Sequence, residues 1–261
     1  MKRTLIIIGL LGHCTPINSF WESFSFFTTE KEEIISLDKK VPTDCSITIK
    51  NKKGNIFVKT WNKHKVVVEA CKKGIEKTLK NALIELTVHQ NNVTLATTNI
   101  DDQETCSINY TVLIPAQVKT LSLHTEKGNI SAENISGQVI ANTEKGNINL
   151  ININGTLKTT TEKGNISFST KNLDSHHSIL AITQKGNVSI ALPEKTSATV
   201  QATTHKGVIT SEHTVTTQPR TMKINKHTAA QLNKELFCTI GSGGPSLKIH
   251  TGKGTIDFII S

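Results

Sequence analysis

The chain has 261 residues, enough for one sizeable domain or two small ones, and carries a net charge of +9. Only 4% of its residues are aromatic, so a core must be built from aliphatic layers, and base stacking on aromatic rings is nearly excluded. We therefore expect no nucleic-acid partner. The positive charge indicates either a lysine-rich solvated surface or a face that meets anionic polymers, such as cell-surface polysaccharide or acidic lipid.

The N-terminus resembles a secretory signal peptide. Lys2 and Arg3 precede the apolar run Thr4–Gly12, which is too short to span a bilayer as a helix, and small or polar residues surround Ser19. We predict a signal peptide over residues 1–19, a linker over 20–33 and export to the periplasm, the cell surface or the medium. Cys14 leaves lipidation open, although His13 stands where a lipoprotein signal has a small residue. No other apolar run is long enough to cross a membrane, so we expect no transmembrane segment after signal removal.

Residues 34–115 predict a less regular β region. Strand-like runs fill Asp44–Lys73, and a helical turn around Ile75–Ala82 precedes a strand through Leu86 and Val88. Pro115 is expected to end the strand before the regular part of the chain.

The sequence TEKGNI occurs three times, with its glycines at Gly128, Gly146 and Gly164, so the step is 18 residues both times (146 − 128 and 164 − 146). Weaker copies of the repeat surround Gly54, Gly186, Gly207 and Gly254. A period of about 20 residues predicts a stack of equivalent β laps, each too small to bury its apolar face alone.

Apolar or threonine residues alternate on both sides of each glycine, as in Leu121, Leu123 and Thr125 before Gly128. Period-two alternation predicts two short strands per lap, each with one inward face, joined by a turn whose glycine takes a positive φ. Stacked laps should bring two sets of polar residues into file. These are Thr125, Thr143, Thr161, Thr183, Thr204 and Thr251, and then Asn129, Asn147, Asn165 and Asn187.

We predict a single-domain, all-β protein, a β-solenoid over residues 34–260. The regular repeats cover about 117–212, and a C-terminal cap covers about 213–260. The cap includes a short-helix candidate at His227–Leu236. Such ends would cover the strand edges that a stack otherwise exposes.

The turns carry a column of lysines directly before the glycines. These candidate polymer contacts are Lys127, Lys145, Lys163, Lys185 and Lys206. A solvated column is the alternative, because Glu126, Glu144 and Glu162 stand beside the first three and offset the repulsion between like charges.

The sequence offers few candidate residues for a metal or cofactor site, and it leaves the state of the cysteines open. Asp174, His176 and His177 form the one metal-like cluster, which needs a loop to converge on an ion, and a solvated loop explains it equally. We expect no metal and no cofactor. Four cysteines follow the predicted signal peptide, and they either form two disulfides or act as small buried hydrophobes. They are Cys45, Cys71, Cys106 and Cys238.

The repeats resemble a known group, the bacterial putative-adhesin family of unknown function, whose members repeat T-x-x-G-[DN]-I. The match consists of TEKGNI at Thr125, Thr143 and Thr161, TQKGNV at Thr183, the lead-in Asn109–Ile130 and the closing segment Ile240–Phe258. The resemblance covers roughly residues 34–260. It implies a β-solenoid in an exported or surface-associated protein, and it transfers no catalytic residues. This chain departs from the family by its lysine before the glycine.

The sequence therefore favours a non-enzymatic exported protein that serves adhesion, envelope scaffolding or the binding of polysaccharide or a surface protein. One alternative is a polysaccharide-active enzyme of the β-helix type, which would need a pair of carboxylates converging on a groove. Another is a binder of anionic polymers that uses the lysine-rich turns.

Overall fold

The computed structural model describes residues 4–5, 30–98, 106–174, 176–217 and 234–261. The predicted signal peptide lies outside the described residues except for Thr4–Leu5, which forms β1 and pairs with β2 (Lys31–Lys40). Residues 31–33, assigned above to the linker, therefore belong to a strand. In the described part of the chain, no helix has both the length and the apolar character needed to cross a membrane.

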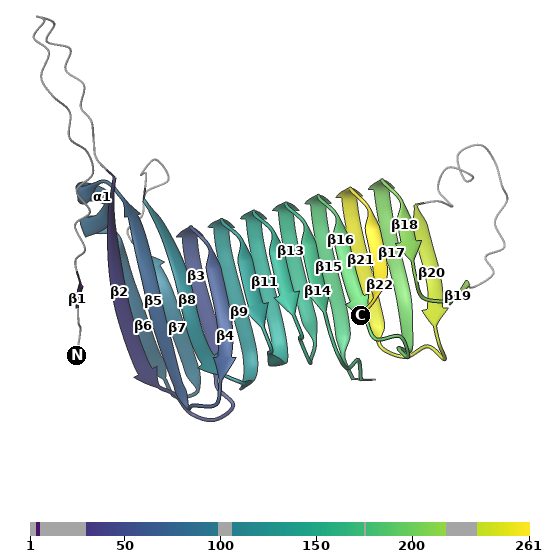
Figure 1. Ribbon diagram of the computed structural model, residues 1–261, viewed down its shortest axis with the longest axis horizontal. Coiled ribbons are helices and arrows are strands. Elements are labelled where there is room, and N and C mark those ends of the chain that lie inside the picture. Colours follow the sequence, from purple (N-terminus) through teal and green to yellow (C-terminus); the bar gives the residue numbers. More distant parts are fainter. Residues whose placement is uncertain (1–3, 6–29, 99–105, 175, 218–233) are drawn as a thin grey trace, which may run out of the picture.

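The fold is all-β, as predicted, and consists of two 11-stranded sheets that run along one long axis (Figure 1). The first sheet has the strand order β1, β2, β5 (Lys65–Gly74), β8 (Ser107–Pro115), β4 (Ile56–Trp61), β10 (Ile130–Glu133), β12 (Ile148–Ile151), β14 (Ile166–Ser169), β16 (Val188–Leu192), β22 (Ile256–Ile260) and β18 (Ile209–Ser211). The second has the order β19 (Val215–Thr217), β20 (Glu235–Ile240), β17 (Ala198–Lys206), β21 (Ser246–Lys253), β15 (Ser178–Lys185), β13 (Leu157–Lys163), β11 (Ser136–Lys145), β9 (Gln117–Lys127), β3 (Ser46–Lys53), β7 (Asn92–Thr98) and β6 (Leu83–His89).

Each repeat places one strand in each sheet. From β9 to β18 the chain passes from the second sheet to the first at a glycine turn and then returns. Neighbouring laps pair in parallel and in register, so Leu123, Ala141 and Thr159 lie over one another as predicted. The laps build two open sheets rather than the closed coil that the solenoid prediction implied.

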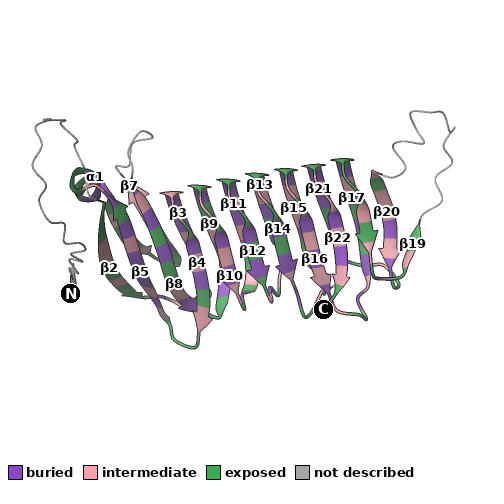
Figure 2. Ribbon diagram, turned by 45° about the horizontal axis from the view of Figure 1, so that its top comes forward, coloured by how far each residue is buried: buried purple, intermediate pink, exposed green. Residues whose placement is uncertain are grey.

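The core lies between the two sheets, and it is aliphatic because the inward positions of every lap are. Figure 2 shows buried residues alternating with exposed ones along the strands, as period-two side-chain geometry requires. Leu121, Val139 and Leu157 are successive inward residues of three laps, each at most 2% exposed. Only three aromatic side chains, Tyr110, Phe168 and Phe258, are among the largest fully buried ones in the described residues.

The order of the laps in space differs from their order in sequence at both ends. The early lap β3–β4, with Gly54, lies directly beside β9–β10. The last lap, β21–β22, lies inside the stack: β21 pairs with both β15 and β17, and β22 with both β16 and β18. The sequence predicted that β21–β22 belong to a C-terminal cap over about 213–260, but these strands lie inside the stack. Instead, β20 and β19 continue the second sheet beyond β17 through antiparallel pairs.

The N-terminal end of the stack is less regular, as expected. The predicted helical turn is α1 (Glu76–Asn81), the strand through Leu86 and Val88 is β6, and β8 ends at Pro115. Here β2, β5 and β8 pair in antiparallel fashion, as do β6 and β7. Most of the short-helix candidate His227–Leu236 lies outside the described residues, and its last two residues begin strand β20.

Candidate functional site

Backbone crowding requires the glycine of every turn. A Cβ built on Gly146 would overlap the carbonyl of Gly128, and a Cβ on Gly128 would overlap the carbonyl of Gly54. The same collision recurs down the file, so every glycine is needed for close backbone approach. The predicted positive φ is found at five of the seven, Gly54, Gly146, Gly164, Gly186 and Gly254, but not at Gly128 or Gly207. In spatial order the file is Gly54, Gly128, Gly146, Gly164, Gly186, Gly254 and Gly207.

The threonine three residues before each glycine donates a hydrogen bond to the carbonyl of the neighbouring lap against which that glycine packs. The Thr161 hydroxyl donates to the carbonyl oxygen of Gly146 in the preceding lap at 3.1 Å, and Thr161 is fully buried. In the first lap Asn51 takes this place, and its amide donates to the carbonyl of Ile108 at 2.7 Å. The other pairs are Thr125 to Gly54, Thr143 to Gly128, Thr183 to Gly164, Thr251 to Gly186 and Thr204 to Gly254.

The asparagine after the glycine forms a second ladder. The backbone N–H of Asn147 donates to the side-chain oxygen of Asn129 at 2.8 Å, and the N–H of Asn165 donates to that of Asn147 at 2.8 Å. The predicted threonine and asparagine files are thus both confirmed. Threonine, glycine and asparagine of the repeat therefore have structural roles, and none of them is left free for chemistry.

The lysine directly before each glycine recurs in every one of these turns. Seven lysines pair Cα to Cα across neighbouring strands at the same turn, and we call them the lysine column. In spatial order they are Lys53, Lys127, Lys145, Lys163, Lys185, Lys253 and Lys206. Neighbouring strands lie about 4.8 Å apart, so the column is about 29 Å long. All but Lys53 are exposed, and they occupy the edge where Figure 2 shows exposed residues at the strand ends.

The sequence prediction gave five of these seven lysines. Lys53 and Lys253 were missed, although both stand directly before a turn glycine that had been recognised, Gly54 and Gly254. The signal was present in NKKGNI and TGKGTI. The sequence did not show that the laps containing Lys53 and Lys253 join the same stack as the regular repeats.

The residues that directly precede the column lysines differ between one half of the column and the other. Glu126, Glu144 and Glu162 precede Lys127, Lys145 and Lys163, whereas Gln184, Gly252 and His205 precede the next three lysines in space. Within the described part of the chain, none of these six lysines forms an ion pair.

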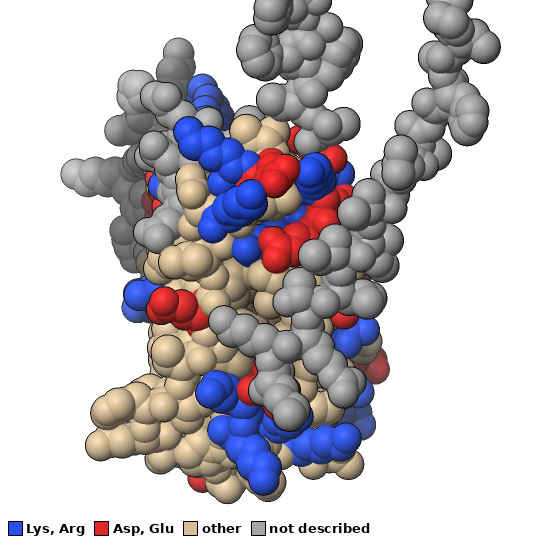
Figure 3. All heavy atoms as spheres, turned by 90° about the vertical axis from the view of Figure 1, so that its left-hand side faces the viewer, with Lys and Arg blue, Asp and Glu red and all other residues tan. Residues whose placement is uncertain are grey.

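Lysines at the N-terminal end behave differently. Figure 3 views this end and shows basic and acidic side chains next to each other. Lys31 pairs with Glu76 at 2.8 Å, and Lys73 with Glu32 at 3.2 Å. Glu76 accepts hydrogen bonds from Lys31 and Lys80, which lower the pKa of its carboxyl to about 2. Lys31, Lys73 and Lys80 are therefore paired with carboxylates, in contrast to the exposed lysines of the lysine column.

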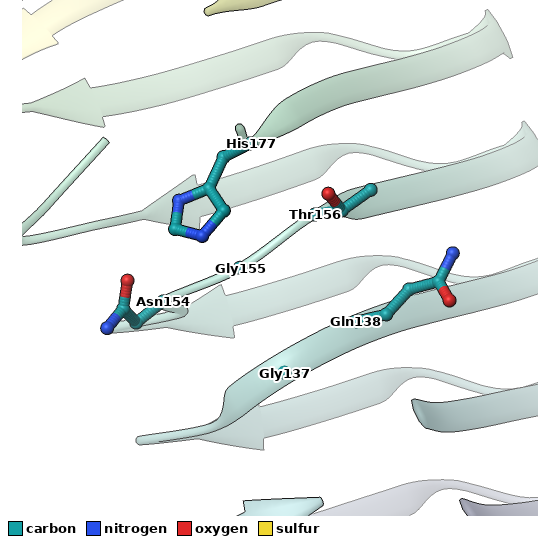
Figure 4. Close-up of a pocket in the computed structure, with 6 residues that line it drawn as sticks. All are labelled: Gly137, Gln138, Asn154, Gly155, Thr156 and His177. Carbon is teal, nitrogen blue, oxygen red and sulfur yellow. The ribbon is translucent and has the colours of Figure 1, made fainter. Parts of the chain in front are cut away.

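A polar hollow of about 400 Å³ lies at the start of the strands of the second sheet (Figure 4). Gly137 and Gly155 form its floor, and Gln138, Asn154, Thr156 and His177 surround it. The Nδ1 of His177 accepts from the backbone N–H of Asp174 at 3.3 Å. In the described residues no three His, Cys, Asp or Glu side chains converge as metal ligands, and Asp174, His176 and His177 make no such group.

The four cysteines are free thiols in this structure. Cys45, Cys106 and Cys238 are at most 2% exposed and belong to the hydrophobic core, whereas Cys71 on β5 is half-buried. Burial raises the pKa of the Cys45 and Cys238 thiols, which disfavours the reactive thiolate. These two side chains therefore act as small hydrophobes.

The chain was compared with curated proteins and with solved structures. A comparison with curated proteins found no match. Among solved structures, the chain is similar to a putative cell adhesion protein from Clostridium sporogenes (13% identity, TM-score 0.46, covering 89% of this chain and 100% of that one). It is also similar to a putative adhesin from Bacteroides fragilis (14%, 0.44, 87% and 97%) and to a putative lipid binding protein from Parabacteroides distasonis (10%, 0.24, 87% and 96%).

A family model described as Toastrack DUF4097 matches residues 11–258, which is nearly the whole chain. That span contains the glycine file, the lysine column and every strand except β1 and the end of β22. The chain belongs to the Toastrack DUF4097 family.

Proposed function

We propose that this is a non-enzymatic, exported protein of the cell envelope or cell surface, and that its lysine column holds an extended anionic polymer. The observation that carries the proposal is the presence of lysine at one turn position in all seven laps. The position directly before it varies freely. In spatial order it holds Lys52, Glu126, Glu144, Glu162, Gln184, Gly252 and His205.

Turn chemistry does not account for these lysines, because the threonine, glycine and asparagine of each lap already provide the turn's hydrogen bonds and close approach. The column instead carries an energetic penalty. Two ammonium groups about 5 Å apart in water repel by about 0.8 kcal/mol before salt screening. An extended polymer with repeating negative charges removes this repulsion lap after lap, which a single small anion cannot do.

The polysaccharide-cleaving alternative has less support. Glycosidic cleavage needs two carboxyl groups on either side of one bond. Glu126, Glu144 and Glu162 lie instead in one file along the turn edge, each next to a lysine. The polar hollow lies at the opposite ends of the strands and has no carboxylate among its lining residues.

The test is binding of the exported chain to immobilised polyanions, with inorganic polyphosphate and polyglutamate as probes and neutral dextran as the control. We expect retention on both polyanions that weakens steeply as salt rises, because lysine contacts release bound counterions. Replacing Lys127, Lys145, Lys163, Lys185, Lys206 and Lys253 together by glutamine should abolish it. A wild-type chain that is not retained at low salt, or a variant that binds as well as wild type, would contradict the proposal.

A further inference from the structure

We propose that the anionic groups are bound chiefly at one end of the lysine column, by Lys185, Lys253 and Lys206, which we call the C-terminal lysine cluster. This inference rests on the proposed function and specifies its site and its ligand chemistry. The ligand is a polymer that carries phosphate or carboxylate groups, and it lies across the turns of the laps β15–β16, β21–β22 and β17–β18.

The cluster exists only because the last lap enters the stack. Lys185 and Lys206 belong to consecutive repeats, but they are not neighbours in space. Lys253, on β21, lies between them and pairs with each in register. Inserting β21–β22 therefore extends a row of two lysines from consecutive repeats to a row of three, with about 4.8 Å between successive strands.

The charges beside the lysines distinguish this cluster from the other half of the column. The three TEKGNI turns each add one Glu and one Lys, so their charges sum to zero (3 − 3). The three turns of the cluster have glutamine, glycine and histidine in place of the Glu, so their lysines contribute +3 with no carboxylate in file. Charges this close are screened by salt far less than charges a Debye length apart, so the positive potential is higher at the cluster than at the three TEKGNI turns.

Nearby acidic groups do not neutralise the cluster. Asp257, on β22, accepts hydrogen bonds from the hydroxyls of Thr210 (2.6 Å) and Thr255 (3.1 Å) on the outer side of the first sheet. Glu235, on β20, pairs across the strand with Thr203. Within the residues that the structure describes, Lys185, Lys253 and Lys206 form no ion pair. His205, directly before Lys206, packs its ring edge to face against that of His250 at 5.1 Å.

The lysine side chain sets the ligand class. An ammonium group is a compact point charge on a flexible stem, and it binds phosphate and carboxylate without the planar fork geometry of arginine. Three such groups in a line favour a ligand with successive anionic groups over a single ion. No Phe, Tyr or Trp stands directly before a cluster lysine, so recognition rests chiefly on charge and spacing rather than on stacking against large aromatic rings.

A pair of matched triple variants tests the inference. K185Q/K253Q/K206Q and K127Q/K145Q/K163Q each remove three exposed lysines from the same turn position. Affinity for polyphosphate and for polyglutamate is measured by titration at low salt, with thermal unfolding as the check that both variants fold. We expect the first variant to lose at least about tenfold more affinity than the second and to lower the salt slope by about two to three units.

The outcomes separate this inference from the proposed function. If wild type binds polyanions and the two triple variants lose affinity equally, or the second loses more, the cluster is not the site and the inference fails while the proposed function stands. If wild type binds neither probe, the proposed function itself fails. Selective loss for polyphosphate assigns phosphate as the ligand group, and equal loss for both probes assigns anionic groups in general.

A third variant gives an independent check. E126Q/E144Q/E162Q removes the carboxylates beside the other lysines and leaves the cluster unchanged. We expect it to bind polyanions more tightly than wild type, because six contiguous turns then carry lysine without an acidic neighbour. Unchanged or weaker binding would show that the carboxylates do not exclude the ligand from that half, and would overturn the inference.

Discussion

The buried threonine before each turn makes one hydrogen bond that holds two laps together. In the middle of the stack, the hydroxyl of Thr161 donates to the carbonyl of Gly146. That carbonyl lies against the next glycine, and the Thr161 side chain that donates to it is fully buried, so removing the hydroxyl leaves the acceptor without this donor.

We therefore expect Thr161→Val, which keeps the shape and removes the hydroxyl, to lower the free energy of unfolding by about 1–3 kcal/mol. Chemical denaturation of both proteins measures the difference. The control is Thr160→Val, at the adjacent position on the outer face of β13, which should change stability by less than about 0.5 kcal/mol. Equal effects of the two substitutions would contradict the role assigned to Thr161.

Tyr110 is the only tyrosine of the chain, so its ionisation can be read directly. The side chain is 1% exposed and its hydroxyl shares a hydrogen bond with Thr97. Burial raises the pKa of Tyr110 to about 12, above its ordinary value of about 10. Because the folded state holds this proton more tightly than the unfolded state, the stabilisation is full below about pH 10 and is lost as pH rises toward 12.

The expected result is that phenolate absorbance stays absent in the folded protein at pH values where free tyrosine is ionised. The same chain in denaturant should titrate near pH 10. A folded protein whose tyrosine titrates as in denaturant would show that the ring is not buried between the sheets.

At the scale of elements, the notable feature is that β21 separates β15 from β17. Leu180 on β15 and Gln201 on β17 each pair with Lys248 on β21, so they lie two strand spacings, about 9.6 Å, apart. A disulfide requires Cα atoms within about 7 Å, which the pair 180 and 248 satisfies and the pair 180 and 201 exceeds.

Cysteines at the two alternative pairs therefore test the order of the strands. We expect L180C/K248C to form an internal disulfide under mild oxidation, seen as a mobility shift that reductant reverses. The matched variant L180C/Q201C should stay reduced. Cross-linking of the second pair would mean that the laps stack in sequence order and that β21–β22 lies elsewhere.

At the scale of the whole molecule, the stack behaves as a chain of equivalent layers in which each lap contacts only its neighbours. Deletion of residues 146–163 removes one complete lap of 18 residues and joins Lys145 to Gly164, which restores the sequence TEKGNI. The glycine, threonine and asparagine ladders can then re-form between the remaining laps.

We expect this shortened protein to fold, with a β-rich circular dichroism spectrum and a cooperative thermal transition at a lower temperature than wild type. Deletion of half a lap, residues 155–163, is the control, because it sends the following strands to the wrong sheet. That variant should lose the cooperative transition. A full-lap deletion that also unfolds would contradict the equivalence of the layers.

The sequence alone determined that the protein is all-β, that its laps have glycine turns, and that Leu123, Ala141 and Thr159 share one inward file. These features are local, because side-chain alternation and the need for glycine repeat within every lap. The tertiary structure alone decided that the laps form two open sheets and that β21–β22 enters the stack between laps that precede it in sequence. Strand pairing depends on shape and hydrogen bonding across long separations, which lap sequences this similar do not specify, so only the folded chain brings Lys253 between Lys185 and Lys206.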